Sequence, residues 1–251
     1  MEKINLSRLK SCMTRAQRGE ELTIGFLGGS ITQGSLATEH ENTYAYRVFT
    51  WWKETFPNAE FHYVNGGIGG TTSHYGVSRA VTDVLMYQPD FVVVDFSVND
   101  EPDEFFQETY EGVIRKLLQW KSEPAVVILN NVFYDTGKTA QDFHNAVGNW
   151  YQVPHVSIKD TLYQEMQQGK YTREELTPDG LHPNDKGHKL VAEKIIAFLE
   201  EVRSHMAEQE DELTIPEPMT QNAYENARRL TIREISPELA GFRADTEEKT
   251  G

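Results

Sequence analysis

Short apolar runs alternate with longer amphipathic stretches along most of this chain. The runs have the length and the β-branched or aromatic composition of buried strands; they lie at residues 22–27, 61–65, 91–96, 125–129 and 153–156. The stretches between them have the apolar spacing of helices; they cover residues 4–18, 42–56, 73–87, 103–120, 139–151 and 184–206. Strands and helices that alternate at this spacing predict an α/β fold with a parallel sheet covered on both faces.

The alternation ends near residue 206. We therefore expect one domain over residues 1–206, a three-layer α/β/α sandwich with right-handed crossovers. Residues 207–251 differ, because acidic residues crowd the start of this segment and Pro216 and Pro218 interrupt it. We interpret it as a linker and C-terminal extension that packs back on the domain or opens a further module. Residues 230–235 are compatible with either a strand or a helix.

Charge and cysteine content exclude several classes of function. The formal net charge is −15, which argues against nucleic acid or an anionic membrane as a partner. Cys12 is the sole cysteine, which excludes an internal disulfide framework and a multi-cysteine metal site. No apolar run has the length of a membrane span, and the polar N-terminus lacks the apolar segment of a secretory signal. These features predict a cytoplasmic protein.

Three strand ends carry groups that are suited to chemistry. The first strand runs into Gly28-Gly29 and then Ser30, the second into a glycine-rich loop that ends at Gly70, and the third into Asn99. The carboxyl ends of parallel strands lie on one edge of a sheet, which is where open α/β sheets bind their ligands. A hydroxyl, a glycine-rich backbone and a side-chain amide are therefore predicted to meet at this edge.

A loop before the last helix adds a carboxylate and an imidazole. Asp179 and His182 are three residues apart, so one turn can bring the carboxylate to one ring nitrogen and leave the other free. A serine nucleophile needs such a base, and the base needs such an acid. The N–H groups of Ser30 and Gly70 and the Asn99 amide are suitable oxyanion donors. Each group also has an ordinary alternative, since Ser30 could be a helix cap and Asp179-Gly180 a turn.

Other motifs are incomplete, and we predict neither a cofactor nor a metal. The glycine loop fails the dinucleotide-binding spacing because residue 72 is Thr. Thr32 likewise breaks the Gly-x-Ser-x-Gly elbow of another hydrolase fold. The acidic residues beside Asn99 could suggest a metal site; they are Asp95, Asp100, Glu101 and Asp103. We expect Asp95 inside a strand and Pro102 to break the run, so we interpret the cluster as a helix N-terminus, which favours negative charge, rather than as metal ligands. The histidines other than His182 are interpreted as surface or core residues.

Taken in order, the four blocks resemble the SGNH/GDSL hydrolase family over about residues 22–200. The resemblance implies a flavodoxin-like α/β/α fold with Ser30 as nucleophile and first oxyanion donor. It implies Gly70 and Asn99 as the other donors, His182 as general base and then acid, and Asp179 as the group that orients His182. Two departures are Gly29, where the family has Asp, and Ser97, where it has Gly. Neither departure alters a reacting group.

The Gly-Gly-Ser-Ile-Thr block is similar to a branch that includes carbohydrate O-acetylesterases. The sequence around Gly70 and Asn99 resembles that of two-domain acetyl-mannan esterases of gut bacteria, in which a carbohydrate-binding β-module follows the catalytic domain. This implies a serine esterase that deacetylates acetylated mannan or similar plant oligosaccharides through an acyl-enzyme, and residues 207–251 as the start of such a module.

Two alternative functions stay open at this point. One is a lysophospholipase or thioesterase on the same scaffold, which would need an apolar channel for its acyl chain. The other is a non-catalytic sugar-binding protein. Such a protein would be expected to have lost at least one of Ser30, Asn99, Asp179 and His182, but all four are present. A homo-oligomer in which residues 207–251 embrace a neighbouring copy is also open.

Overall fold

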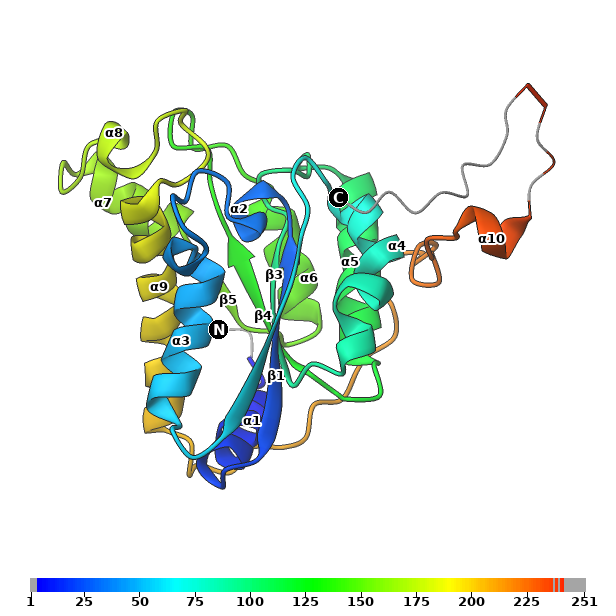
Figure 1. Cartoon of the computed structure of the whole chain (residues 1–251), viewed down its shortest axis with the longest axis horizontal. Helices are drawn as coiled ribbons and strands as arrows, with labels where there is room; N and C mark the ends of the chain where they lie inside the picture. The colour runs from blue at the N-terminus through cyan, green and yellow to red at the C-terminus, as the bar shows by residue number, and fades with distance from the viewer. Residues whose placement is uncertain (1–3, 237, 239, 242–251) are drawn as a thin grey trace.

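A five-stranded sheet forms the centre of the computed structural model, which describes residues 4–236, 238 and 240–241 (Figure 1). Its strands are β1 (Glu21–Gly28), β2 (Glu60–Gly67), β3 (Phe91–Asp95), β4 (Ala125–Asn130) and β5 (His155–Ser157). The strand order is β2-β1-β3-β4-β5, and every neighbouring pair is parallel. The predicted parallel α/β fold is confirmed.

The central strands are apolar on both faces because each face is covered. Along β3, Phe91 and Val93 belong to one hydrophobic core, whereas Val92 and Val94 belong to the other. All four side chains are fully buried. Successive side chains of a strand point to opposite faces, so an uninterrupted apolar run identifies a strand with a core on either side.

Three long helices pack on each face of the sheet, which gives the three predicted layers (Figure 1). One face carries α1 (Ser7–Gln17), α3 (Tyr44–Thr55) and α9 (Asp185–Ser204); the other carries α4 (Ser73–Asp83), α5 (Glu104–Leu118) and α6 (Gln141–Trp150). The shorter elements are α2 (Ser30–Gln33), η1 (His40–Asn42), η2 (Leu85–Tyr87), η3 (Lys159–Tyr163), α7 (Gln164–Gln167), α8 (Arg173–Leu176) and α10 (Ile232–Ile235).

Side-chain caps fix the start of three of the long helices. Thr43 accepts a hydrogen bond from the N–H of Tyr46 at the start of α3, and Asn184 accepts one from Gly187 at the start of α9. Asp103 caps α5 in the same way. The predicted helix N-terminus in the acidic cluster is therefore present at Asp103.

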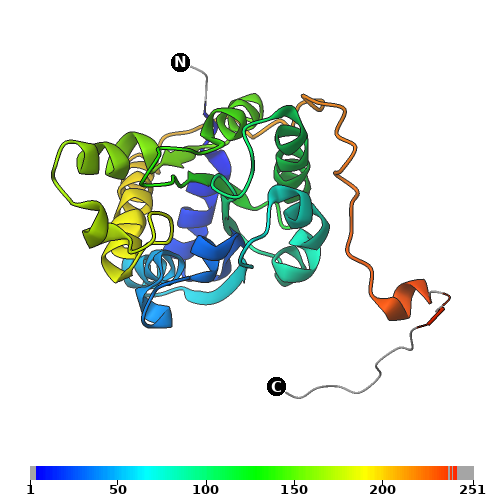
Figure 2. The same ribbon diagram turned by 90° about the horizontal axis from the view of Figure 1, so that it is seen from above.

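The segment after α9 packs back on the outer face of α5 and α4 (Figure 2). Buried Glu111 accepts hydrogen bonds from the N–H groups of Met219 and Thr220, and Arg115 donates to Pro216 O. Between residues 207 and 236 the structure shows no β-strand, and residues 232–235 form the short helix α10. The final residues of the expected module, 242–251, lie outside the described residues.

Candidate active site

Ser30 lies at the carboxyl edge of the sheet, as the first residue of α2 (Figure 1). Only Gly29 separates Ser30 from the end of β1, and Ser30 is 8% exposed. The short helix α2 ends at Gly34, whose φ of 102° lies in the left-handed region that favours glycine. The glycines on both sides of α2 thus let the chain turn sharply enough to present the Ser30 side chain at the sheet edge.

His182 and Asp179 complete a chain of hydrogen bonds with this hydroxyl. The distance from Ser30 Oγ to His182 Nε2 is 2.8 Å, and that from His182 Nδ1 to Asp179 Oδ2 is 2.7 Å. A carboxylate only accepts hydrogen bonds, so Nδ1 carries the proton and Nε2 is free to accept from Ser30. The structure therefore brings together the three predicted residues in an arrangement suited to serine nucleophilic catalysis.

The loop that carries His182 is organised by Asp179. Its Oδ1 accepts hydrogen bonds from the backbone N–H groups of Leu181 and His182 and from the Thr177 hydroxyl. Partial burial raises the pKa of Asp179, but hydrogen bonds from the His182 ring, these N–H groups and Thr177 outweigh it and hold that pKa well below its ordinary range. Asp179 is therefore ionised at neutral pH and keeps the proton of His182 on Nδ1.

The glycine loop after β2 lies beside the nucleophile. A Cβ added at Gly69 would be 3.7 Å from Ser30 Cβ. The N–H of Gly69 donates to Gln33 Oε1 at 2.8 Å, and Asn65 Nδ2 donates to Thr32 O at 2.8 Å. Helix α2 therefore fixes both the nucleophile and the loop that precedes Gly70.

The three predicted oxyanion donors have no hydrogen-bond partner within the described part of the chain. They are the N–H groups of Ser30 and Gly70 and the side-chain amide of Asn99. Gly70 has a φ of +69°, and a Cβ added there would meet nothing within 4 Å. Unused donors beside a nucleophile are suited to holding an oxyanion, and their assignment to that role stays a prediction.

The absence of a side chain at Gly29 makes room for Asn99. A Cβ added at Gly29 would overlap Asn99 Oδ1 and lie 3.4 Å from Asn99 Nδ2. An aspartate at position 29, as in the Gly-Asp-Ser motif of the family, would therefore displace the Asn99 amide in this chain. Glycine at position 29 is therefore compatible with this position of the Asn99 side chain.

A buried arginine that the sequence analysis did not single out supports both the turn before Ser30 and the glycine loop after β2. Arg79, on α4, has no exposed surface, and it donates hydrogen bonds to Gly28 O, Gly66 O and Thr71 Oγ1. Its ion pair with Asp83 balances the buried charge. A cation at a buried position of an amphipathic helix is the sequence signal that could have identified it.

Asp95 is a second buried group beneath the nucleophile turn. Its Oδ2 accepts hydrogen bonds from Asn131 Nδ2 at 2.9 Å and from Thr32 Oγ1 at 3.4 Å, and its backbone oxygen accepts from the N–H of Gly29. Its Oδ1 has no partner in the described residues. Burial raises the pKa of Asp95 to about 7, because these hydrogen bonds only partly offset the loss of hydration.

Replacing Asp95 with asparagine is expected to flatten the pH dependence of stability. Above about pH 4 the unfolded state loses the Asp95 proton, whereas the folded state keeps it up to about pH 7. The free energy of unfolding should therefore fall as pH rises through this window, by about 4 kcal/mol at 1.4 kcal/mol per pKa unit. Urea unfolding of both proteins from pH 4 to pH 8 tests this. An unchanged pH dependence in Asp95→Asn would contradict the account.

The acidic residues after β3 have separate roles. Asp103 caps α5, whereas the side chain of Asp100 is fully buried and pairs with His144 Nε2 at 3.0 Å. Asp100 does not belong to the N-terminus of α5, which begins at Glu104 with Asp103 as its cap. Its carboxylate instead accepts from the N–H of Ser73 at the N-terminus of α4 and pairs with His144, 44 residues away on α6. Among the described residues no group of three or more His, Cys, Asp or Glu side chains is arranged to hold a metal ion.

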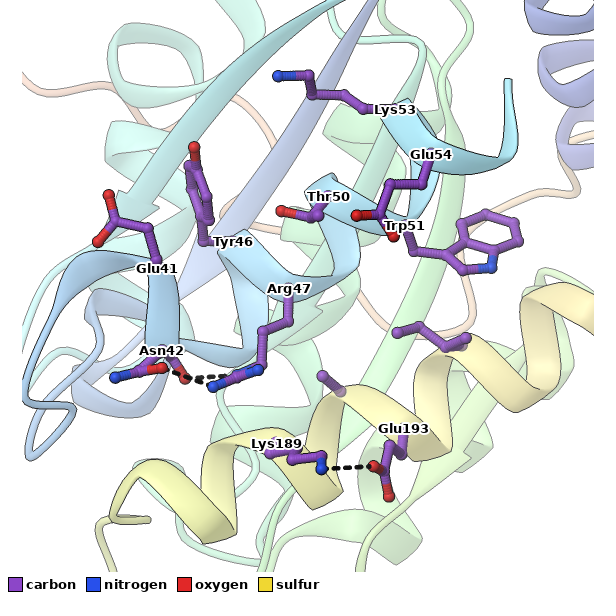
Figure 3. Close-up of a pocket in the computed structure, with 12 residues that line it drawn as sticks. Glu41, Asn42, Tyr46, Arg47, Thr50, Trp51, Lys53, Glu54, Lys189 and Glu193 are labelled. Carbon is purple, nitrogen blue, oxygen red and sulfur yellow. Dashed lines mark hydrogen bonds and ion pairs between the residues drawn. The ribbon is translucent and has the colours of Figure 1, made fainter. Parts of the chain in front are cut away.

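A groove of about 730 Å³ lies between α3 and α9 (Figure 3). Charged side chains line much of it, including Arg47, Lys189 and Glu193. None of Ser30, Asp179 and His182 borders it. The groove is therefore separate from the candidate active site.

No helix in the described ranges combines the length and the apolar character needed to cross a membrane.

Comparison with known proteins identifies the family. Residues 26–190 match the GDSL-like Lipase/Acylhydrolase family. A solved two-domain esterase active on acetylated mannans, co-crystallised with mannopentaose, is 48% identical with a TM-score of 0.94; the match covers 100% of this chain and 67% of that one. The same esterase in a second crystal structure gives a TM-score of 0.95 at 48% identity, over 99% of this chain and 67% of that one.

More distant structures share the fold. The acetylxylan esterase Axe2 from Geobacillus stearothermophilus, as a catalytic mutant, is 15% identical with a TM-score of 0.61, over 72% of this chain and 95% of that one. No curated protein sequence matches. Because the family match spans more than half of the chain and agrees with the esterase at 48% identity, this chain belongs to the GDSL-like lipase/acylhydrolase family and is a carboxylic ester hydrolase.

Proposed function

We propose that this protein is a serine esterase that removes O-acetyl groups from acetylated oligosaccharides, with mannan-type chains as the first candidates. The observation that carries the proposal is the hydrogen-bonded chain from Ser30 through His182 to Asp179. The substrate class is supported by the 48% identity to an esterase active on acetylated mannans. The intact Ser30, Asn99, Asp179 and His182 disfavour a non-catalytic sugar-binding protein.

The proposed reaction passes through an acetyl-enzyme. His182 Nε2 takes the Ser30 proton while Ser30 Oγ attacks the acetyl carbonyl carbon. The resulting oxyanion would accept hydrogen bonds from the N–H groups of Ser30 and Gly70 and from the Asn99 amide. Collapse breaks the bond to the sugar oxygen, which leaves with the proton held by His182. His182 then deprotonates water, which attacks the acetyl carbon; as the bond to Ser30 Oγ breaks, His182 returns the proton to Oγ and acetate leaves.

A series of esters separates this function from a lipid esterase on the same scaffold. Rates on 4-nitrophenyl esters of increasing acyl length should be highest for acetate and should fall as the chain lengthens. A preference for long acyl chains would assign the protein to lysophospholipase or thioesterase chemistry instead.

An aromatic cluster next to the oxyanion loops supports an oligosaccharide substrate. His74 follows Gly70 by four residues, and Phe105 follows Asn99 by six. The ring centroids of His74 and Phe105 are 5.3 Å apart, and Tyr224 lies 5.5 Å from His74 and 5.8 Å from Phe105. Phe105 is 42% exposed. Aromatic faces stack on the C–H faces of sugar rings, so we propose this cluster as a contact for sugar units beside the acetylated one.

Replacing Phe105 with alanine should weaken binding of oligosaccharides selectively. The loss of one stacking contact, about 1 kcal/mol, should raise KM for an acetylated manno-oligosaccharide about fivefold. The kcat/KM for 4-nitrophenyl acetate should not change. Tyr87 is a matched control, since it is 53% exposed but lies in η2 ahead of β3, at the opposite edge of the sheet. Equal effects of Phe105→Ala on both substrates would contradict this contact.

The location and assembly of the protein are separate proposals. The single cysteine Cys12, which is buried and free, suits a reducing compartment, and we propose the cytoplasm. A homo-oligomer held by residues 207–251 stays a prediction that sedimentation of the full chain can test.

A further inference from the structure

Asp100 ties together the two loops that hold the predicted oxyanion donors. It directly follows Asn99, and its side chain is fully buried. Its Oδ1 accepts a hydrogen bond from the N–H of Ser73 at 2.8 Å, and its Oδ2 lies 3.0 Å from His144 Nε2. Ser73 begins α4, three residues after Gly70. One carboxylate therefore connects the Asn99 turn, the end of the glycine loop and helix α6.

We infer that Asp100 is a positioning residue that sets the separation of the Gly70 N–H and the Asn99 amide, and that His144 holds Asp100 in place. The inference rests on the proposed function, because it concerns the same oxyanion site. It assigns to Asp100 and His144 a role in the reaction although neither touches the substrate.

The backbone around Asp100 leaves its carboxylate little freedom. The N–H groups of Asn99 and Asp100 both donate to Phe96 O at 2.9 Å. The side chain is fixed at one oxygen by Ser73 and at the other by His144. A shift of the Asp100 side chain would therefore move the Asn99 turn relative to α4. Oxyanion donors act only when they lie within a few tenths of an ångström of the correct position.

A histidine at a fully buried position such as 144 is unusual, because most buried side chains are apolar. Its ring is fully buried and stacks on Tyr110, with ring centroids 3.6 Å apart and an angle of 3° between the planes. Nε2 must donate to Asp100, because a carboxylate only accepts. Nδ1 then has no partner in the described residues, which costs free energy compared with an apolar ring. What the histidine supplies in return is the hydrogen bond to Asp100.

A double-mutant cycle with Asn99 tests the inference. Asp100→Ala should lower kcat for 4-nitrophenyl acetate about 10- to 100-fold with little change in KM, because a displaced donor loses part of its contribution to the transition state. In an Asn99→Ala background the same change should cost no more than about threefold, since the donor that it positions is already absent. Equal losses in both backgrounds would overturn the inference.

A conservative variant keeps the test independent of folding. Asp100→Asn retains the oxygen that accepts from Ser73, and its amide can donate to His144 Nε2 if the ring takes the Nδ1–H tautomer. That tautomer breaks no other hydrogen bond, because Nδ1 has no partner in the described residues. Asp100→Asn should therefore fold and retain kcat within about threefold. A well-folded Asp100→Asn with the full loss of Asp100→Ala would overturn the account.

Glu111 provides a matched buried carboxylate remote from the donors. It is fully buried on α5, and it accepts hydrogen bonds from the Met219 and Thr220 N–H groups. Glu111→Ala should lower the melting temperature while leaving kcat within about twofold in both backgrounds. A comparable loss of kcat would show that the Asp100 effect is general destabilisation. These assays need only an ester that the enzyme hydrolyses, such as 4-nitrophenyl acetate. If the carbohydrate assignment is wrong, a separate assay will show it, because no acetate will be released from acetylated sugars.

Discussion

Replacing Ser30 with alanine is expected to lower kcat for ester hydrolysis by about 10⁴- to 10⁶-fold. The Ser30 hydroxyl hydrogen-bonds to His182 Nε2, and in the described part of the chain no other hydroxyl hydrogen-bonds to this nitrogen. The substitution removes a single hydroxyl and leaves no bulk to accommodate, so the fold should persist with an unchanged far-ultraviolet spectrum. Initial rates with 4-nitrophenyl acetate, together with thermal unfolding, measure both properties.

Ser78→Ala is the control for this substitution. Ser78 is half-buried on α4, and its hydroxyl donates to Tyr75 O. This variant removes a serine hydroxyl without touching the site, so its rate should equal that of the unaltered protein. A stable Ser30→Ala protein with a near-normal rate would refute the assignment of the nucleophile.

Replacing His182 with alanine should cause a loss of similar size and should also remove the acidic limb of the rate–pH profile. His182 accepts the Ser30 proton only when Nε2 is unprotonated, so the rate should fall at low pH, where this nitrogen is protonated. Asp179 adds no second group to this limb, because its own pKa is held well below its ordinary range. Of the three residues Ser30, His182 and Asp179, only His182 should therefore contribute to the acidic limb of kcat/KM between pH 5 and pH 9.

The exposed His205 is the matched control for the pH experiment. His205→Ala should retain both the rate and the acidic limb. If the residual activity of His182→Ala keeps the same acidic limb, another group must act as the base.

The sequence was sufficient to predict which residues the fold brings to the candidate site, because parallel sheets have a simple geometry. Ser30, Gly70 and Asn99 each follow a strand, and parallel pairing brings the ends of β1, β2 and β3 to one edge. The spacing of Asp179 and His182 was equally informative, since a three-residue separation permits the observed 2.7 Å contact. These placements depend only on the order of elements and on local spacing.

The supporting shell could not be predicted in the same way. Asp95 and Asn131 are 36 residues apart, and Asp100 and His144 are 44 residues apart. Such pairs form between elements whose relative register is set by packing across the whole domain, so no local pattern reveals them. The sequence analysis also missed the short elements η3, α7 and α8 between β5 and α9. They have too few residues to show a helical period, and packing against the rest of the domain determines their form.

The most direct test of the account measures acetate released from acetylated manno-oligosaccharides, with acetylated xylo-oligosaccharides and a long-chain acyl ester alongside. The unaltered protein should release acetate from the sugar substrates, and Ser30→Ala should release none above background. Turnover of the long-chain ester alone, or acetate release that persists in Ser30→Ala, would contradict the proposal that Ser30 deacetylates a carbohydrate.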